Sequence, residues 1–230
     1  RTGLRPISRK WFPAAVFFTG ILLTLLASYY ASRTIQLRMR ARFETAALRA
    51  RTTLRAQFEV YDTILHGAAG FIAVEKEVSR ERFRKYIDRL RLDGNYPGVQ
   101  GIGFAPRVSA PDKDSLVAAI RQQGEPKCRI STGTERADFF PIVYLEPENH
   151  RNDAAYGFDM FTDAVRRDAM ERARDTADTA ASGKVALVQD IEPTKQPGFL
   201  IYIPVYQDGS VPGTVAERRA KLQGFVFCVF

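Results

Sequence analysis

The sequence predicts an α+β protein in which a transmembrane helix and a long stalk helix precede an antiparallel sheet with helices. Three observations lead to this prediction. Residues 11–30, WFPAAVFFTGILLTLLASYY, contain no charged side chain. Apolar side chains then recur at helical spacing from Met39 to Ile72. Beyond about residue 99, short β-branched and aromatic runs alternate with helix-like segments.

The positive charge of the chain is concentrated near its N-terminal end. The net charge is +8 over 230 residues, yet residues 1–51 hold ten basic residues and one acid, Glu44, against 24 bases and 25 acids in the remainder. A nearly neutral body lacks the basic footprint that a phosphate backbone requires, so no nucleic-acid partner is expected. The length suits one sizeable domain with an additional element, since domains average roughly 100–200 residues.

Residues 11–32 are predicted to form the transmembrane helix. The twenty uncharged residues suffice for a hydrocarbon core of about 30 Å, and Trp11, Tyr29 and Tyr30 lie at the ends, where aromatic rings favour the membrane interface. The alternative is a cleaved signal peptide, but its apolar region is usually about 7–15 residues long and no small-x-small site follows this one. Basic residues flank both ends, so charge alone does not orient the helix.

Residues 33–75 are predicted to continue this helix as a stalk. Its apolar residues are separated by three or four positions, close to the 3.5-residue period of a coiled coil. They are Met39, Phe43, Ala47, Ala50, Leu54, Phe58, Tyr61, Leu65, Ala68 and Ile72. This stripe either pairs with the same helix of a second copy, giving a homodimer, or packs on its own domain.

The remaining pattern predicts helices with polar caps and strands bounded by Pro and Gly. Expected helices cover 79–92, 112–123 and 162–181, with Ser79, Asp112 or Asp114, and Thr162 or Asp163 as caps. Expected strands cover 99–108, 139–145, 185–189, 199–206 and 224–230. We expect 185–189 and 199–206 to form a hairpin, Pro204 to mark an edge or a bulge, and the helices to cover one face of the sheet.

The residue patterns give no indication of an enzyme in this chain. No Walker A, G-x-S-x-G or H-E-x-x-H motif occurs, and His66 and His150 are far apart in sequence. Glu146, Glu148 and His150 form too weak a pattern for a metal site, and Cys128 and Cys228 are too few for a disulfide framework. We therefore expect no catalytic residue, no metal and no cofactor.

Several ordered segments resemble the CHASE domain, the extracellular sensory domain of membrane histidine kinases and cyclases, which includes the plant cytokinin receptors. The segments are YPGVQGIGFAPRV (96–108), FFPIVYLEPENHRND (139–153), YGFDMFTDAVRRDAMERARDT (156–176), FLIYIPVY (199–206) and TVAERRAKLQGFVF (214–227). The resemblance runs over about residues 60–230, and we assign 76–230 to the domain.

This resemblance implies a stalk and two PAS-like lobes outside the cytoplasm, then a second membrane helix and a cytoplasmic output module. Residues 1–10 would be a cytoplasmic flank, and the residues after about 33 would be periplasmic or extracellular, in an inner or plasma membrane. The chain starts without Met and stops within the strand-like GFVFCVF, so we expect a piece of a longer protein whose domain continues beyond Phe230.

The resemblance also implies a small-molecule site. Asp159, in Gly157-Phe158-Asp159-Met160, matches the aspartate that hydrogen-bonds the adenine ring in cytokinin-binding members, although an aspartate at such a place also serves as a turn or cap. A backbone group of Ala181 matches a second polar contact, but Ala181-Ser182-Gly183-Lys184 departs from the plant pattern, which puts cytokinin itself in doubt. Predicted wall residues are Phe104, Phe140, Val143, Tyr202 and Tyr206. Arg218 is assigned a structural ion pair.

The function that follows is ligand sensing by a membrane receptor, with a sensor histidine kinase as the preferred output. The alternatives are a diguanylate or adenylate cyclase receptor, a sensor of peptides or proteins, and a purely structural dimerisation stalk. The expected partners are a small molecule, the membrane and a second copy of the chain.

Overall fold

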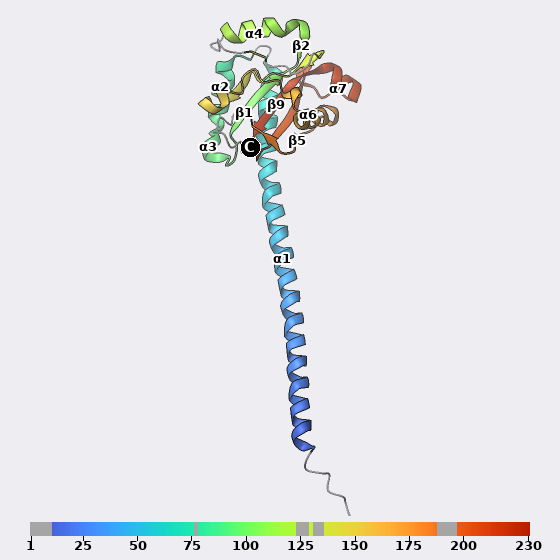
Figure 1. Ribbon diagram of the computed structural model, residues 1–230. Coiled ribbons are helices and arrows are strands. Elements are labelled where there is room, and N and C mark those ends of the chain that lie inside the picture. Colours follow the sequence, from blue (N-terminus) through green and yellow to red (C-terminus); the bar gives the residue numbers. More distant parts are fainter. Residues whose placement is uncertain (1–10, 76–77, 123–128, 131–135, 188–196) are drawn as a thin grey trace, which may run out of the picture. The chain divides into compact units, whose positions relative to one another are not determined.

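The computed structural model describes residues 11–75, 78–122, 129–130, 136–187 and 197–230. The chain forms two compact units, Arg1–Phe58 and Glu59–Phe230. The predicted α+β class is confirmed: a long N-terminal helix with an apolar span precedes an antiparallel sheet with helices (Figure 1). Cys128, Gln123 and the end of the expected strand 185–189 lie outside the described residues.

Helix α1 (Phe12–Val74) runs without interruption for 63 residues. Its first 22 residues, Phe12–Arg33, have a mean hydropathy of 1.8 and are not buried, so this span is long and apolar enough to cross a membrane. No proline occurs between Ala14 and the end of the helix, and this lets the hydrogen-bond ladder continue.

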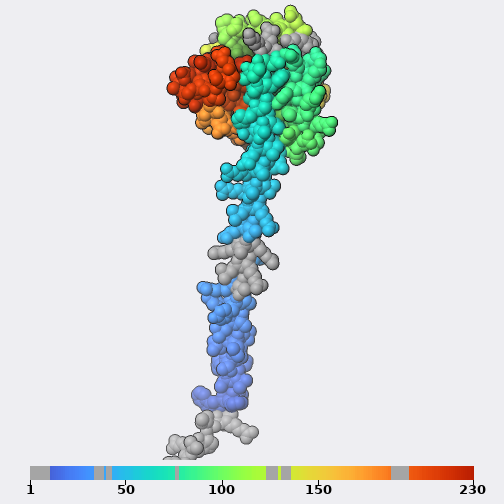
Figure 2. Space-filling view, turned by 180° about the vertical axis from the view of Figure 1, so that it is seen from behind, coloured from blue at the N-terminus to red at the C-terminus, as the bar shows by residue number. Residues whose placement is uncertain are grey.

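The apolar stripe of α1 has two environments. Its later members are buried in the second unit: Tyr61, Leu65, Ala68 and Ile72. Earlier members are exposed: Met39, Phe43, Leu54 and Phe58. The later part therefore packs on its own domain, beside helix α2 (Arg80–Leu90), as the teal and green surfaces of Figure 2 show. Pairing of the earlier part with a second copy stays a prediction.

Five antiparallel strands form the main sheet in the order β4-β1-β9-β8-β5. Their bounds are β1 Gly101–Pro106, β4 Tyr144–Glu146, β5 Ala180–Ala181, β8 Leu200–Tyr206 and β9 Leu222–Val229. Strand β9 is central, and its register with β1 runs from Gly101 opposite Val229 to Pro106 opposite Gly224. Gly103 permits the close packing of β4 against β1, because a Cβ at this position would lie 2.4 Å from the Tyr144 carbonyl oxygen.

Two short strand pairs complete the sheet structure that is described. Strand β2 (Val108–Ser109) pairs with β3 (Asp138–Phe139), and β6 (Val185–Ala186) pairs with β7 (Pro197–Gly198). The expected hairpin is thus antiparallel, but Val185 lies opposite Gly198, before β8 begins. Pro204 pairs with Phe225, one residue before the register shift between Val205 and Tyr206, so the expected bulge is confirmed next to this proline.

Helices cover both faces of the sheet, so the expectation of one covered face is wrong. One face packs on α6 (Ala164–Thr176) through Ala169, Met170 and Ala173. The opposite face packs on α1, α2 and α4 (Lys113–Gln122). Because side chains alternate along each strand, Phe225 and Phe227 of β9 face α6, whereas Val226 and Cys228 face α1.

The smaller helical elements lie in the connections. They are α3 (Leu92–Asn95), η1 (Ala110–Asp112), α5 (His150–Asp153), η2 (Met160–Thr162), η3 (Gln207–Gly209) and α7 (Val215–Lys221). The Ser79 and Asp163 caps are confirmed: the Ser79 side chain accepts from the Arg82 N–H, and the Asp163 side chain accepts from the N–H groups of Val165 and Arg166.

Two expected elements differ from the structure. The run 139–145 is not one strand, because Phe140 and Ile142 bond to residues 157–160 instead of the sheet: the Ile142 N–H donates to Phe158 O and Phe140 O accepts from the Met160 N–H, both at 3.1 Å. The helix expected through Ala181 ends at Thr176, since Ala177 adopts a left-handed conformation and Ala180 then pairs with Tyr202 of β8. Helix α7 was not expected.

Candidate functional site

Asp159 is completely buried and is the N-cap residue of η2. Its Oδ1 accepts from the backbone N–H of Phe140 at 2.9 Å and of Phe161 at 3.2 Å. Its Oδ2 accepts from Arg136 in an ion pair. The carboxylate thus caps η2 and also joins the 139–143 segment to η2, so the capping role weighed from the sequence is present.

Arg136 is the partly exposed member of this ion pair, with 19% of its side chain accessible. Its Nη1 donates to the carbonyl oxygen of Phe161 at 2.5 Å, and its guanidinium lies 5.7 Å from the ring centre of Phe139. Arg167 also donates to Phe161 O, at 3.3 Å. Two arginines therefore converge on the η2 turn, and no sequence pattern indicated either of them.

The predicted wall residues lie on opposite faces of the sheet. Phe140, Tyr202 and Tyr206 belong to the core that faces α6, the side of Asp159. Phe104 and Val143 belong to the core that faces α1 and α2. The structure therefore does not bring all of the predicted residues together, and only the first group can share a site with Asp159.

Ala181 lies at the edge strand β5 and is exposed. Its carbonyl oxygen accepts from Arg172 Nη2 at 2.9 Å, and Ala181 pairs with Ile201 of β8. Tyr206 donates its hydroxyl to the Arg174 carbonyl at 2.7 Å, and burial raises the pKa of Tyr206 to about 12. Tyr206 thus anchors the C-terminal half of α6 to the sheet.

Arg166 and Tyr202 place polar groups in the core between α6 and the sheet. Arg166 is 3% exposed, donates from Nη2 to the Ala186 carbonyl at 2.9 Å, and lies 4.9 Å from the ring centre of Phe158. Its Nε is buried with no hydrogen-bond partner among the described residues, and the same holds for the Tyr202 hydroxyl. Burial lowers the pKa of Arg166 and raises the pKa of Tyr202.

Phe104 and Val143 line a separate cavity of about 180 Å³ on the α1 side of the sheet. Its other lining residues come from α1, β1, α4, β4 and β9, and from the chain after α1: Ile72, Glu75, Val78, Pro106, Leu116, Ala119, Ile120, Tyr144 and Gln223. Tyr144 closes part of it by donating its hydroxyl to the Val78 carbonyl at 2.6 Å. The cavity is lined by both apolar and polar groups, the latter including Glu75 and Gln223, and Asp159 does not line it.

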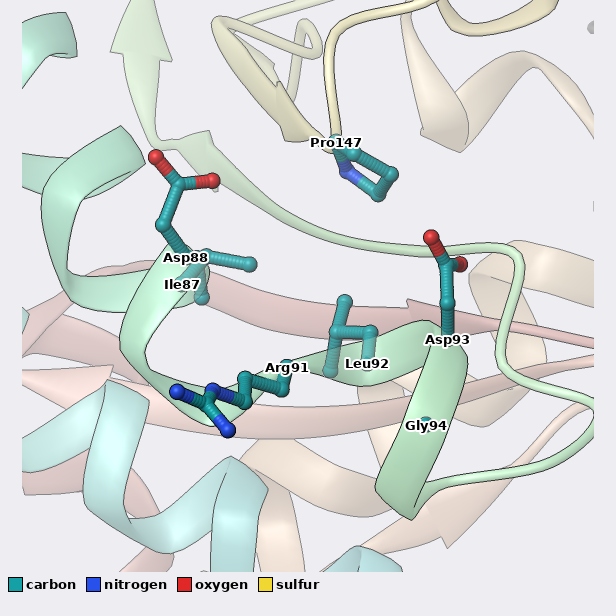
Figure 3. Close-up of a pocket in the computed structure, with 7 residues that line it drawn as sticks. All are labelled: Ile87, Asp88, Arg91, Leu92, Asp93, Gly94 and Pro147. Atoms are coloured by element: carbon teal, nitrogen blue, oxygen red, sulfur yellow. The ribbon is translucent and has the colours of Figure 1, made fainter.

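A second hollow, of about 250 Å³, lies at the α2–α3 turn. Figure 3 shows Asp88 and Asp93 on its two sides, Ile87 and Leu92 between them, and Pro147 across the opening. No third metal-ligating side chain joins these carboxylates among the residues described in the structure, so the hollow is not built as a metal site.

Glu146 is a buried carboxyl that the weak E-P-E-N-H pattern contained but did not explain. It is fully buried on β4, and neither side-chain oxygen has a hydrogen-bond partner in the described part of the chain. Burial raises the pKa of Glu146, an effect that the positive charge of Arg80 partly offsets.

Arg218 has the structural role expected of it, but through different contacts. Its guanidinium donates to the carbonyl oxygens of Pro212, Asp175 and Gly213 at 2.9, 2.7 and 3.4 Å. The ion pair with Asp175 is made by the next residue, Arg219, at 2.6 Å. Together they hold α7 against the end of α6.

Comparison with known proteins supports one family. A family model described as "CHASE domain" matches residues 76–230. The chain is also 26% identical, over 228 residues, to "Hybrid signal transduction histidine kinase A" of Dictyostelium discoideum. The aligned region covers 94% of this chain but 10% of that protein, so the chain spans about a tenth of its relative's length.

Proposed function

This chain belongs to the CHASE domain family, and from that premise we propose that it senses a small molecule outside the cytoplasm and signals across the membrane to a histidine kinase. A sensory domain of a signal-transduction receptor is what the family match and the kinase relative support directly. The ligand, the direction of α1 in the membrane and the kinase output are parts of the proposal.

The observation that carries the proposal is the shared use of Asp159. Its Oδ1 is held by two backbone N–H groups, whereas its Oδ2 is held by one partly exposed arginine. A ligand with an N–H edge can replace Arg136 at Oδ2 without disturbing the backbone contacts at Oδ1. The apolar side chains of Phe140, Phe161 and Met160 surround this position, which suits a heterocycle whose orientation depends on a few polar contacts.

The proposed signalling route depends on the part of α1 that is buried against the sheet. Tyr61, Leu65, Ala68 and Ile72 of α1 are part of the core on the second face of the sheet, and the same helix contains the apolar span. A ligand that binds better to one packing of the sheet shifts the population of that packing. Because α1 packs on this sheet, the shift reaches the helix that leads to the membrane.

The test is a thermal-stability measurement of the whole chain in lipid nanodiscs, with adenine and a panel of other neutral heterocycles. Asp159→Asn keeps an acceptor for the backbone but loses the carboxylate oxygen that faces Arg136, so we expect it to abolish at least nine-tenths of the melting shift. Glu171→Gln, an exposed acid on α6, is the matched control and should keep the full shift. A shift of equal size in parent and Asp159→Asn would contradict the assignment of Asp159. Absence of a shift with every compound would contradict small-molecule sensing of this class.

A further inference from the structure

Three buried side-chain donors, contributed by the chain next to η2, by α6 and by β8, have no hydrogen-bond partner in the described structure. They are Arg136 Nε, Arg166 Nε and the Tyr202 hydroxyl. All three are donors in the states these side chains adopt, because guanidinium groups only donate and a buried tyrosine hydroxyl stays protonated. Buried donors normally have acceptors, so three of them in one region point to an acceptor that binds there.

Arg166 is a buried positive charge in this region. Arg166 is 3% exposed, and no ion pair of its side chain occurs among the described residues. Asp163 is the acid that influences both Arg166 and Tyr202, but its Oδ1 is occupied by the N–H groups of Val165 and Arg166 at 2.9 and 3.0 Å. The N-terminal end of the 13-residue helix α6 adds its positive dipole end at the same place.

The acceptor that suits this set is an anion. A carboxylate or a phosphate can accept from a guanidinium and a hydroxyl together, and such charge-assisted hydrogen bonds are stronger than neutral ones. The ring of Phe158, which lies 4.9 Å from the Arg166 guanidinium, is partly exposed, so the anion would reach Arg166 from this side. The neighbouring Arg167, which donates to Phe161 O, adds to the attraction for a negative group.

We infer that Arg166 and Tyr202 form an anion-recognising subsite, and that the sensed molecule carries a carboxylate or a phosphate group. This inference rests on the proposed function, and it names the chemical class of the ligand. The anionic group binds Arg166 Nε and the Tyr202 hydroxyl, and the remainder of the molecule extends towards Asp159.

The experiment measures melting of the whole chain in phosphatidylcholine nanodiscs with inorganic phosphate, acetate, succinate or citrate, each matched to sodium chloride of equal ionic strength. We expect phosphate or the carboxylates to raise the melting temperature of the parent. Tyr202→Phe removes only the unpartnered hydroxyl, so it should fold normally and bind the same anion at least tenfold more weakly. Arg166→Met should abolish the effect, and Arg89→Met, an exposed arginine on α2, should leave it unchanged.

The outcomes separate the two proposals. A shift with phosphate alone identifies a phosphate group, and a shift with carboxylates alone identifies a carboxylate. No shift with any of the four anions overturns the subsite, as does equal anion affinity in Tyr202→Phe and the parent. If the anions fail while a neutral heterocycle gives an Asp159-dependent shift, the sensory function stands and the anion subsite is wrong. Should Arg166→Met not fold, Tyr202→Phe decides the result.

Discussion

Asp159 has a structural role, and we propose that it also recognises the ligand, because its two oxygens have different partners. The partners of Oδ1 are backbone N–H groups, whereas the partner of Oδ2 is the side chain of Arg136, which is 19% exposed. Removing a buried acceptor leaves its donors unsatisfied, which costs about 1–3 kcal/mol for each group. A loss of stability in Asp159→Ala would therefore not separate the two roles, and Asp159→Asn is the more informative variant.

Glu146 predicts an unusual pH dependence of stability. Burial raises the pKa of this carboxyl in the folded protein above its ordinary value near 4.5. The folded state then binds more protons than the unfolded state above about pH 4.5, so this group makes stability fall as pH rises through that window. We expect Glu146→Gln to be more stable than the parent at pH 8 by about 1–3 kcal/mol, with the difference lost near pH 4.

Urea unfolding of the whole chain at pH 4, 6 and 8 measures this difference. Glu148→Gln is the control, because Glu148 is a partly exposed acid that pairs with Arg84 and Arg80 in the same region. Between pH 6 and 8, the free energy of unfolding of Glu148→Gln should change with pH by the same amount as that of the parent. If the free energy of unfolding of Glu146→Gln changes with pH in parallel with that of the parent, burial does not raise the pKa of Glu146.

At the scale of elements, the contact between α6 and α7 includes the ion pair of one acid, Asp175, with Arg219. Hydrogen bonds from Arg219 and Arg174 hold the pKa of Asp175 well below its ordinary value of 3.8. A lowered folded pKa gives stability that is present above the unfolded pKa and is lost as pH falls below about 4. We expect Asp175→Asn to cost about 0.5–1 kcal/mol at pH 7, as for a partly exposed ion pair, and this difference from the parent to shrink as pH falls from about 4 towards about 2.

Thermal melting from pH 7 to pH 2 checks this expectation. The parent should lose more stability than Asp175→Asn below pH 4. Asp168→Asn, at an exposed i,i+4 pair with Arg172 on the same helix, should change stability by less than about 0.5 kcal/mol. If the melting temperatures of the parent and of Asp175→Asn fall equally with pH, the Asp175 carboxylate does not stabilise the fold.

The elements with local signals could be predicted, and those set by distant contacts could not. Ser79 and Asp163 identify helix starts because their side chains bond within two or three residues. Helix α7 has the same kind of signal, the Thr214–Glu217 capping box, which could have revealed it. In contrast, the end of α6 depends on the pairing of Ala180 with Tyr202, which no local pattern contains.

At the scale of the molecule, the candidate site was only partly predictable for a similar reason. Alternation within a strand can be read from the sequence, but the face that each strand presents depends on its register with its neighbours. Phe104 and Tyr202 therefore looked equivalent, although one faces α1 and the other faces α6. Arg136 lies in none of the segments that resemble the family, and Arg166 lies in one of them but had no predicted role, because only tertiary packing shows their contacts.

The exposed half of the α1 stripe leads to a prediction about assembly. Phe43 and Leu54 are 75% and 59% exposed, with a spacing that matches a coiled-coil seam. An apolar stripe of this kind is expected to be covered by a second copy. Leu54→Cys, made with Cys128→Ser, should therefore form a disulfide-linked dimer of the chain in membranes. Cys228 should not interfere, because burial raises the pKa of its thiol and keeps it unreactive.

Thr52→Cys provides the matched control for this crosslink. Two residues along a helix correspond to about 200° of rotation, so position 52 points away from the seam that contains Leu54. Mild oxidation followed by non-reducing electrophoresis should give mostly dimer for Leu54→Cys and little for Thr52→Cys. Equal crosslinking at both positions would indicate random collision of helices without a defined interface. No crosslinking at either position would contradict pairing of the stripe with a second copy of the chain. A defined seam would connect the two sensory units through the helix that contains the apolar span, so ligand binding in one unit would bear on both.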